Sequence, residues 1–455
     1  MGLKLKPAKP KFKVVSTKKS KVVTGVKQKS ELTAIPYQRC FLYGSALVAA
    51  EIEDSDFCVH GPQGCMSAVQ EAFAVQGKEY DYHQSGLTQT DVIFGGERCL
   101  TKSLVEALHP YEKAGPKFMV SSCAPEIIGD NMDKIAALVN PKIPLVKVSG
   151  GGFKGNQYDG IEKTLLALVA RFATQKRTKR GLVNLIGTIG LSPTWRADTY
   201  AAGQLLQEFN LQVNYLGCNS SITNFVQAAS AQATVLLSPL VGYAAANFLK
   251  EQFHQPFFCS SLYLPLGLRG IETWLKEILP ELGVSPSAVA TFLAKKENWL
   301  RDKLKVGLGQ TVFIKKIMAA KESRVAIAAE GEVAFAWYRF LAEELELPVR
   351  LVILRTKTAE VEENFRRWQT KLKTETQLLW QPDWFTCQAA LKKEKINFML
   401  GSSLECELAQ ANGAAIFLIT HPNTTTLFLA ERATLGYGGL INTVESLLNS
   451  LKEVA

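Results

Sequence analysis

The stretch KFMVSSCAPEIIGD, residues 117–130, decides the fold class of this chain. Its opening run, KFMV, is typical of a buried strand, and a helical pattern begins soon after it. A strand that ends in a short polar turn and leads into a helix is the repeating unit of a parallel α/β sheet. Ligands of such sheets lie beyond the carboxyl ends of the strands, so Cys123 stands where a functional group is expected.

The same alternation of short apolar runs and longer helical stretches continues to the end of the chain. A buried strand is also expected around Cys58, and further strands are predicted at residues 182–186, 211–216, 233–237, 324–329, 348–354, 398–400 and 415–419. Strands that alternate with helices form parallel sheets covered on both faces. The fold class is therefore predicted to be α/β, with three Rossmann-like parallel-sheet domains.

Length and hydropathy set the expected domain boundaries and cellular location. At roughly 100–200 residues per domain, 455 residues suggest about three domains. They are expected at residues 31–180, 181–320 and 321–455. The chain has no run of roughly 20 apolar residues that would cross a bilayer, and its basic start lacks the apolar core of a secretory signal. We expect a cytoplasmic protein without a membrane partner.

The basic character of the chain is confined to its N-terminal segment. Residues 1–30 contain ten lysines and no acidic residue, whereas the other 425 residues carry 42 basic and 42 acidic side chains. A nucleic-acid-binding domain places basic residues on one face of its folded body, so the net charge of +10 does not indicate nucleic-acid binding. Residues 1–30 are predicted to be a disordered lysine-rich tail.

Three of the nine cysteines stand out by their context. Cys40 precedes a glycine-containing segment, Cys65 ends the glycine-flanked turn HGPQGC, and Cys123 follows the KFMV strand. Backbone N–H groups at the start of a helix stabilise a thiolate, which is the form that an iron–sulfur cluster requires. There is no C-x-x-C pair, so neither a zinc ribbon nor a ferredoxin-type cluster is indicated.

Three thiolates do not complete a four-cysteine cluster. Either the site is open or another chain supplies the remaining ligands. The residues alone also leave open that these cysteines are ordinary buried side chains, which free cysteines often are. We expect Cys58, Cys99, Cys387 and Cys406, which have no ligand spacing, to be simple packing residues.

The chain resembles the β subunit of nitrogenase component 1, the molybdenum–iron protein family. The intervals of 25 residues from Cys40 to Cys65 and 58 residues from Cys65 to Cys123 are similar to those of the family's three P-cluster cysteines. Five segments carry the resemblance in order: HGPQGC (60–65), DVIFGG (91–96), CAPEIIGDNM (123–132), INFMLGSS (396–403) and ATLGYGGLINTVESLLNS (433–450). Their order and spacing together are specific, although each is short.

The resemblance implies a site at a subunit interface. Cys40, Cys65 and Cys123 would be the β contribution to an [8Fe–7S] P-cluster shared with an α-type subunit, in an α2β2 heterotetramer whose domains pack around that metal site. A homodimeric [4Fe–4S] reductase that uses ATP would dock at Phe94, Gly95 and Gly96 and deliver electrons. The alternative interpretation of Phe94 is an ordinary core aromatic.

The catalytic iron–sulfur cofactor is expected in the partner subunit, and no catalytic residue is assigned to this chain. An α subunit needs a cysteine after a strand of the second domain, where this chain has Ser238-Pro239. His421 does not match the α-type histidine motif and is expected to be a loop or core histidine. A glycine stands where the β subunit often has a cluster-ligating serine, with Ser149 nearby, so ligation by Ser149 stays open.

These departures indicate an alternative or nitrogenase-like member of the family rather than the molybdenum enzyme, and we expect an anaerobic oxidoreductase. Methylthio-alkane reductases, which keep a P-cluster and reduce carbon–sulfur bonds, are the leading candidate group for the substrate. A nitrogen-reducing alternative nitrogenase β subunit and a cofactor-assembly scaffold subunit are the other candidates. A weaker alternative is an α/β protein that has kept the fold without a cluster.

Overall fold

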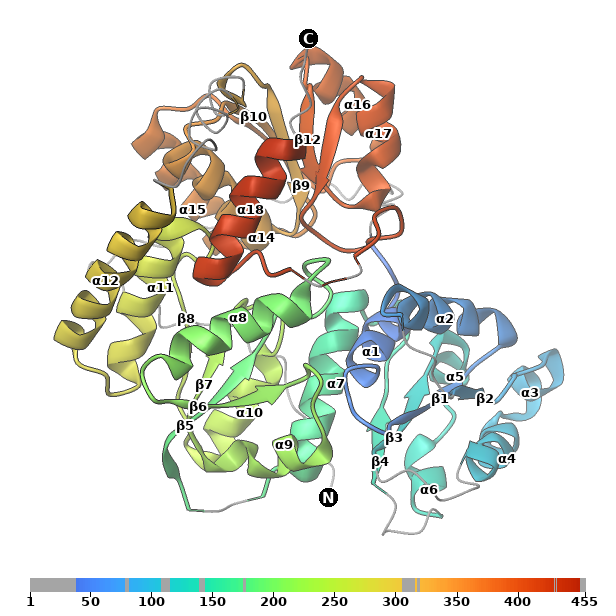
Figure 1. Ribbon diagram of the computed structural model, residues 1–455. Coiled ribbons are helices and arrows are strands. Elements are labelled where there is room, and N and C mark those ends of the chain that lie inside the picture. The colour runs from blue at the N-terminus through green and yellow to red at the C-terminus, as the bar shows by residue number, and fades with distance from the viewer. Residues whose placement is uncertain are drawn as a thin grey trace.

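Three parallel β-sheets, each flanked by helices, make up the computed structural model (Figure 1). The structure describes residues 38–77, 82–107, 115–138, 144–174, 177–304, 316, 320–428, 430 and 432–450. The predicted tail at residues 1–30 lies outside the described residues. The three sheets and their helices confirm the predicted α/β class of Rossmann-like parallel sheets.

The first sheet has the strand order β2-β1-β3-β4. Its strands are β1 (Asp56–His60), β2 (Tyr82–Gln84), β3 (Lys117–Ser121) and β4 (Leu145–Val148). The two central strands are buried along their whole length, and the Lys117 ammonium is accommodated because it pairs with the Asp56 carboxylate. The accompanying helices are α1 (Phe41–Ala49), η1 (Gln63–Cys65), α2 (Met66–Val75), α3 (Gln89–Phe94), α4 (Glu97–Ala107), α5 (Cys123–Ile128), α6 (Met132–Ala136) and α7 (Gln157–Phe172).

The second sheet has the order β6-β5-β7-β8. Its strands are β5 (Lys179–Ile186), β6 (Gln212–Leu216), β7 (Ala231–Leu236) and β8 (Phe257–Cys259). Strand β5 begins with two basic residues, Lys179 and Arg180, which are exposed. The helices are α8 (Trp195–Gln207), α9 (Ile222–Gln227), η2 (Ala228–Ser230), α10 (Tyr243–Phe253), α11 (Gly267–Glu281) and α12 (Pro286–Leu304).

The third sheet has five strands in the order β11-β10-β9-β12-β13. They are β9 (Val325–Ala329), β10 (Val349–Leu354), β11 (Gln377–Trp380), β12 (Phe398–Gly401) and β13 (Ala415–Leu418). The helices are α14 (Gly331–Arg339), η3 (Phe340–Glu344), α15 (Ala359–Leu372), α16 (Trp384–Lys393), η4 (Ser403–Glu405), α17 (Cys406–Ala411) and α18 (Gly436–Ser450). The central strand β9 reads VAIAA and is fully buried, as expected for a strand covered on both faces.

Helices α7 and α18 are among the elements that join the sheets to one another. Helix α7 packs against α1 on one side and against α10 of the second sheet on the other. Helix α18, drawn in red in Figure 1, follows the last strand of the third sheet but contacts α8 and α11 of the second. The C-terminal helix α18 therefore packs on the second sheet's helices as well as on the third sheet. Most of the buried apolar side chains of the described residues form one continuous core.

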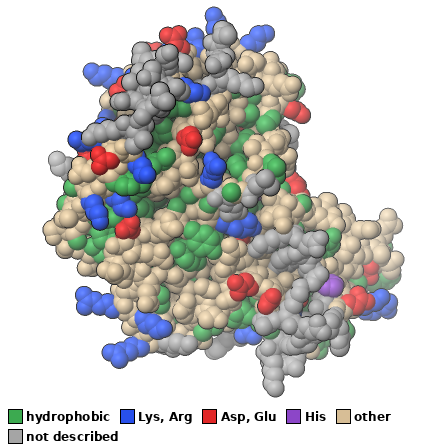
Figure 2. Space-filling model, in the orientation of Figure 1, with side chains coloured by type: hydrophobic (Ala, Val, Ile, Leu, Met, Phe, Trp, Pro, Cys, Tyr) green, Lys and Arg blue, Asp and Glu red, His purple; other side chains and the backbone are tan. Residues whose placement is uncertain are grey.

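Charged side chains of both signs are interspersed on the face shown in Figure 2. Among the described residues, none of the helices combines the length and the apolar character that a bilayer crossing requires.

Candidate metal centre

Cys123 occupies the turn at the carboxyl end of β3 and is the first residue of α5. Its sulfur accepts a hydrogen bond from the backbone N–H of Gly152, with 2.9 Å between the two atoms. A Cβ atom on Gly151 would lie 2.9 Å from the Cys123 Cα, so only glycine lets the loop after β4 approach this closely. The GGG loop thus supplies an N–H donor that stabilises a thiolate at Cys123.

Cys65 ends the turn η1 beyond the neighbouring strand β1 and is half-buried. Gly61, in the same turn, lies so close to Ser122 that a Cβ there would come within 2.2 Å of the Ser122 Oγ. Burial raises the pKa of the Cys65 thiol, the nearby Ser122 hydroxyl lowers it in part, and charge on Cys123 and Cys40 raises it further. The three cysteines are therefore near enough to interact electrostatically.

Cys40 is exposed and caps the N-terminus of α1. Its backbone pairs with Asn156, which caps the N-terminus of α7. The two helices touch at glycines, since a Cβ on Gly44 would lie 1.8 Å from the Gln157 carbonyl oxygen and one on Gly160 would lie 2.1 Å from that of Phe41. This close helix contact fixes Cys40 at the start of α1, whereas Cys65 and Cys123 follow the carboxyl ends of the central strands β1 and β3.

The three thiols fit an extended metal centre better than a single ion. All three are free of disulfides. Among the described residues, no group of three or more Cys, His, Asp or Glu side chains is arranged to hold one metal ion. The Ser122 Oγ is buried beside Cys65 and has no hydrogen-bond partner of normal geometry, so it is free to donate to a thiolate or a sulfide. Sulfur ligands with such N–H and O–H donors are the donor set of an iron–sulfur cluster.

Phe94 lies at the surface and is not a core aromatic. It ends the short helix α3 with 83% of its side chain exposed, and Ile93 beside it is 74% exposed. Gly95 ends the helix with φ of 99°, a conformation that favours glycine. Ile127 on the adjacent helix α5 is also exposed, so an apolar surface lies next to the Cys123 segment. Neither Ile93 nor Ile127 was predicted from the sequence as part of this surface.

Ser149 is exposed at the end of β4, and no hydrogen bond joins it to a cysteine among the described residues. The hydrogen bond to the Cys123 sulfur comes from the backbone of Gly152 instead. Of the cysteines expected to be packing residues, Cys58 and Cys387 are buried. Cys99 and Cys406 are only partly buried because both lie near helix starts at the surface.

A buried charged network, which was not predicted from the sequence, lies beyond the carboxyl ends of the third sheet's strands. Arg355, after β10, donates to both carboxylate oxygens of Glu405 at 2.7 Å and pairs with Glu330, after β9. Tyr158 of α7 donates to the Glu330 carboxylate and ties the network to the first domain. The sequence feature that could have indicated this network is a single charged residue directly after an apolar strand, as in RVAIAAE and LVILR.

His421 belongs to the same network and is buried, as predicted for a core histidine. Its Nε2 shares a hydrogen bond with the Tyr43 hydroxyl, and its carbonyl accepts one from Arg355 at 2.9 Å. Burial lowers the pKa of His421 to about 3, and the positive charges of Arg355 and Arg39 contribute. The imidazole is therefore neutral in the folded chain at neutral pH.

His421→Gln should reduce the loss of stability in acid. Below the ordinary pKa of histidine, about 6.5, the unfolded chain takes up a proton that the folded chain refuses until about pH 3, so stability falls as the pH falls through this window. The cost is at most about 1.4 kcal/mol per pH unit. Thermal midpoints at pH 7 and pH 5 should therefore differ less in His421→Gln than in the unchanged chain. Equal differences would contradict the prediction.

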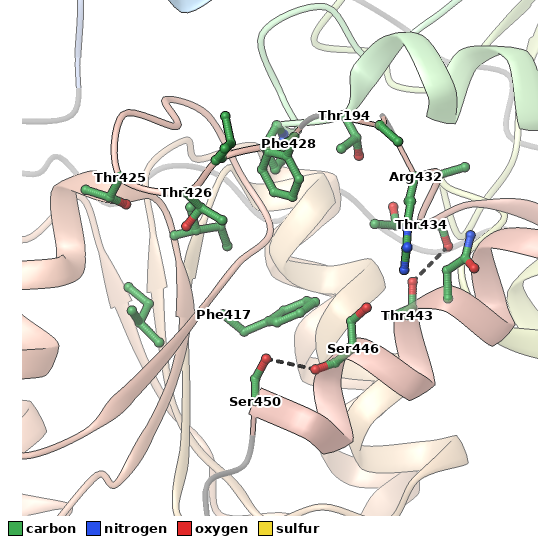
Figure 3. Close-up of a pocket in the computed structure, with 17 residues that line it drawn as sticks. Thr194, Phe417, Thr425, Thr426, Phe428, Arg432, Thr434, Thr443, Ser446 and Ser450 are labelled. Atoms are coloured by element: carbon green, nitrogen blue, oxygen red, sulfur yellow. Dashed lines mark hydrogen bonds between the residues drawn. The ribbon is translucent and has the colours of Figure 1, made fainter.

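A cavity of about 670 Å³ lies between β13, α18 and the loop before α8 (Figure 3). Phe417 and Phe428 supply aromatic walls, and the hydroxyls of Thr443 and Ser446 line one side. No cysteine or histidine is among the described residues that line it. The cavity therefore offers no sulfur or imidazole ligand to a metal cofactor.

The model of the family of nitrogenase component 1 type oxidoreductases matches residues 40–452, from the first of the three cysteines almost to the end. The chain belongs to the nitrogenase component 1 family. The family resemblance expected from the five sequence segments is confirmed.

Relatives within the nitrogenase component 1 family identify a β-type chain. The chain is 24% identical over 440 residues to the nitrogenase vanadium-iron protein beta chain of Trichormus variabilis, covering 89% of this chain and 90% of the relative. It is 21% identical over 457 residues to the nitrogenase molybdenum-iron protein beta chain of Methanococcus maripaludis, covering 93% and 96%. A solved structure, nitrogenase Cp1 at pH 6.5, has the same fold, with a TM-score of 0.78 at 15% identity over 94% and 95% of the two chains.

Proposed function

We propose that this chain is the β-type subunit of a nitrogenase-like reductase and relays electrons. Cys40, Cys65 and Cys123 hold one half of an [8Fe–7S] P-cluster, and an α-type partner supplies the other half within an α2β2 heterotetramer. The observation that carries the proposal is the approach of three free thiols from three separate segments, close enough to interact electrostatically.

Each residue of the centre has a distinct task in this proposal. Cys40 is exposed and faces the partner, whereas Cys65 and Cys123 lie deeper, toward the sheet. The backbone N–H of Gly152 donates to the Cys123 sulfur, and the buried Ser122 hydroxyl is available to donate to the cluster; such donors tune a cluster's potential. The bound cluster would accept electrons one at a time and pass them on to the catalytic iron–sulfur cofactor of the α-type subunit.

The electrons come from a homodimeric [4Fe–4S] reductase that hydrolyses ATP. Its docking surface on this chain is the apolar patch formed by Ile93, Phe94 and Ile127 beside Gly95 and Gly96. Large exposed apolar side chains grouped on adjacent helices mark protein-interaction surfaces. The patch lies on the helix next to the Cys123 segment, which keeps the electron path short.

Reduction of carbon–sulfur bonds in methylthio-alkanes is the proposed overall reaction. It rests on the departures of the sequence from the molybdenum enzyme, including the glycine loop at residues 150–152. The substrate chemistry is assigned to the α-type partner, because the β-type resemblance places the catalytic cofactor in that subunit.

Anaerobic purification of the complex, followed by iron and sulfide analysis, tests the proposed function. We expect the iron of one [8Fe–7S] cluster per αβ pair beyond that of the catalytic cofactor. With reductase and ATP, the complex should release thiol product from methylthio-ethanol and reduce dinitrogen poorly. Efficient dinitrogen reduction would instead identify an alternative nitrogenase. A labile cluster without any turnover would identify an assembly scaffold.

Phe94→Ala should weaken reductase docking without unfolding the chain. The side chain is 83% exposed, so its removal should change stability by no more than about 0.5 kcal/mol. Loss of an aromatic anchor at an interface typically costs about 1–2 kcal/mol of binding, which raises the reductase concentration at half-maximal activity roughly tenfold. Phe385→Ala is the matched control, because Phe385 is 79% exposed but lies on α16 of the third sheet. Equal effects of the two variants would place docking elsewhere.

A further inference from the structure

Three segments around the metal centre meet at one buried pair of side chains, His60 and Asp130. His60 ends β1 just before the turn that carries Cys65, and Asp130 follows α5, which begins with Cys123. The His60 Nε2 and the Asp130 Oδ2 are 2.8 Å apart. The other oxygen of Asp130 accepts a hydrogen bond at 2.9 Å from the backbone N–H of Gly96, directly after the docking helix α3.

Further contacts make the junction rigid. The His60 Nδ1 is 2.9 Å from the Ser85 Oγ, which also accepts a hydrogen bond from the Gly61 N–H. The Ser122 N–H donates to the His60 carbonyl at 2.8 Å. Gly96 packs so tightly that a Cβ there would lie 3.0 Å from the His60 Cε1 and 2.5 Å from the Asp130 Oδ2. The segment after the docking helix therefore cannot shift without moving this pair.

We propose that His60 and Asp130 are positioning residues that couple reductase docking at α3 to the loops holding Cys65 and Cys123. This inference rests on the proposed function. A partner that presses on Phe94 moves Gly95 and Gly96, Asp130 transmits the movement to α5, and His60 transmits it to the Cys65 turn. Electron transfer depends steeply on cluster geometry, so small loop shifts on docking open the path.

Burial makes the pair suitable for this task. The His60 side chain is 0% exposed and that of Asp130 is 4% exposed, so water does not replace a broken hydrogen bond. As an acceptor, Asp130 fixes the proton of a neutral His60 on Nε2, and the Nδ1 then accepts from the Ser85 hydroxyl. Both ring nitrogens of His60 and both oxygens of Asp130 have a partner, so the three segments are held in one arrangement.

Asp130→Ala and Asp130→Asn in the complete, cluster-loaded complex test the coupling. In Asp130→Asn, the amide oxygen can still accept from the Gly96 N–H, and the NH2 group can donate to the His60 Nε2. His60 then carries its own proton on Nδ1. Alanine breaks both links. In single-turnover stopped-flow measurements with reductase and MgATP, Asp130→Ala should slow electron transfer by about tenfold or more. Asp130→Asn should recover most of the rate, while iron content and half-saturation by the reductase stay as in the unchanged complex.

Two further variants complete the test. Ser103→Ala is the matched control, because Ser103 is a buried residue of α4 whose hydroxyl contacts the sulfur of Cys58 rather than the His60 and Asp130 pair. It should transfer electrons at the normal rate. His60→Gln keeps a donor for Asp130 but loses Ser85, and it should also slow transfer, which provides a second measurement if Asp130→Ala does not fold.

The outcomes separate this inference from the function on which it rests. Normal transfer rates in Asp130→Ala or, where that chain is unfolded, in His60→Gln overturn the coupling while leaving the relay function intact. Loss of iron from both Asp130 variants also overturns it, because the pair then only holds the cluster in place. An unchanged complex that contains no [8Fe–7S] cluster refutes the proposed function itself.

Discussion

Cys65→Ala is expected to abolish both the redox signal of the cluster and substrate reduction by the complex. Cys65 is half-buried, and negative charge on either Cys123 or Cys40 raises the pKa of its thiol. Removing one of three thiolates leaves an iron atom without its protein ligand, so the cluster is lost. The chain should stay folded, because Cys65 lies in a turn and is only partly buried against the core.

Cys58→Ala is the matched control for the cluster ligand. Cys58 lies in β1, seven residues before Cys65, and is 2% exposed. Its replacement should cost on the order of 1 kcal/mol of stability through lost packing, yet leave iron content and the spectrum of the cluster unchanged. Iron analysis and electron paramagnetic resonance of both variants check the pair. A normal cluster signal and turnover in Cys65→Ala would show that Cys65 is not a ligand.

Arg355→Leu should destabilise the chain by about 3–5 kcal/mol. The substitution leaves the carboxylates of Glu330 and Glu405 buried without their cation, and both side chains are at most 5% exposed. It also removes the donor to the His421 carbonyl and to the Ser402 hydroxyl. Removing one member of a buried ionic network lowers the free energy of unfolding strongly, because an uncompensated charge stays buried. Replacing the whole network by apolar residues would have a much smaller effect.

Lys321→Ala tests whether burial causes that effect. Lys321 pairs with Glu346 at 2.8 Å, but the two side chains are 40% and 72% exposed. Solvent screens such a pair, so its loss should cost less than about 1 kcal/mol. Chemical denaturation of the two variants beside the unchanged chain gives the comparison. A similar midpoint for Arg355→Leu and Lys321→Ala would show that the network does not hold the third domain to its neighbours.

The strands that the sequence pattern revealed differ physically from those that it did not. Central strands such as β3 and β9 are buried on both faces, so they read as unbroken apolar runs. The unpredicted strands β2, β4, β8 and β11 all lie at sheet edges, although two other edge strands, β6 and β13, were predicted. Edge strands are partly exposed and short, and their composition resembles that of loops. Every strand that the pattern missed is an edge strand, so position in the sheet, which is a tertiary property, limited which strands were recognisable.

The candidate centre shows the same division. The spacing of Cys40, Cys65 and Cys123 identified the three candidate ligands through the family resemblance, and the family itself is confirmed. Nothing local indicated that Gly152 would donate to the Cys123 sulfur, or that Ser122 would be left without a partner. Those contacts join residues from different loops, so they exist only after the sheet has formed.

The order of apolar runs and turns determined the α/β class and the parallel sheets, because strand and helix periodicities are properties of neighbouring residues. The set of candidate cysteines came from the family resemblance. Tertiary structure alone decided that Phe94 is exposed, that Arg355 is buried among carboxylates, and that His60 and Asp130 meet. Burial and pairing depend on residues distant in the chain that close packing brings together. A local sequence pattern therefore does not indicate which distant residue will pack against a given side chain.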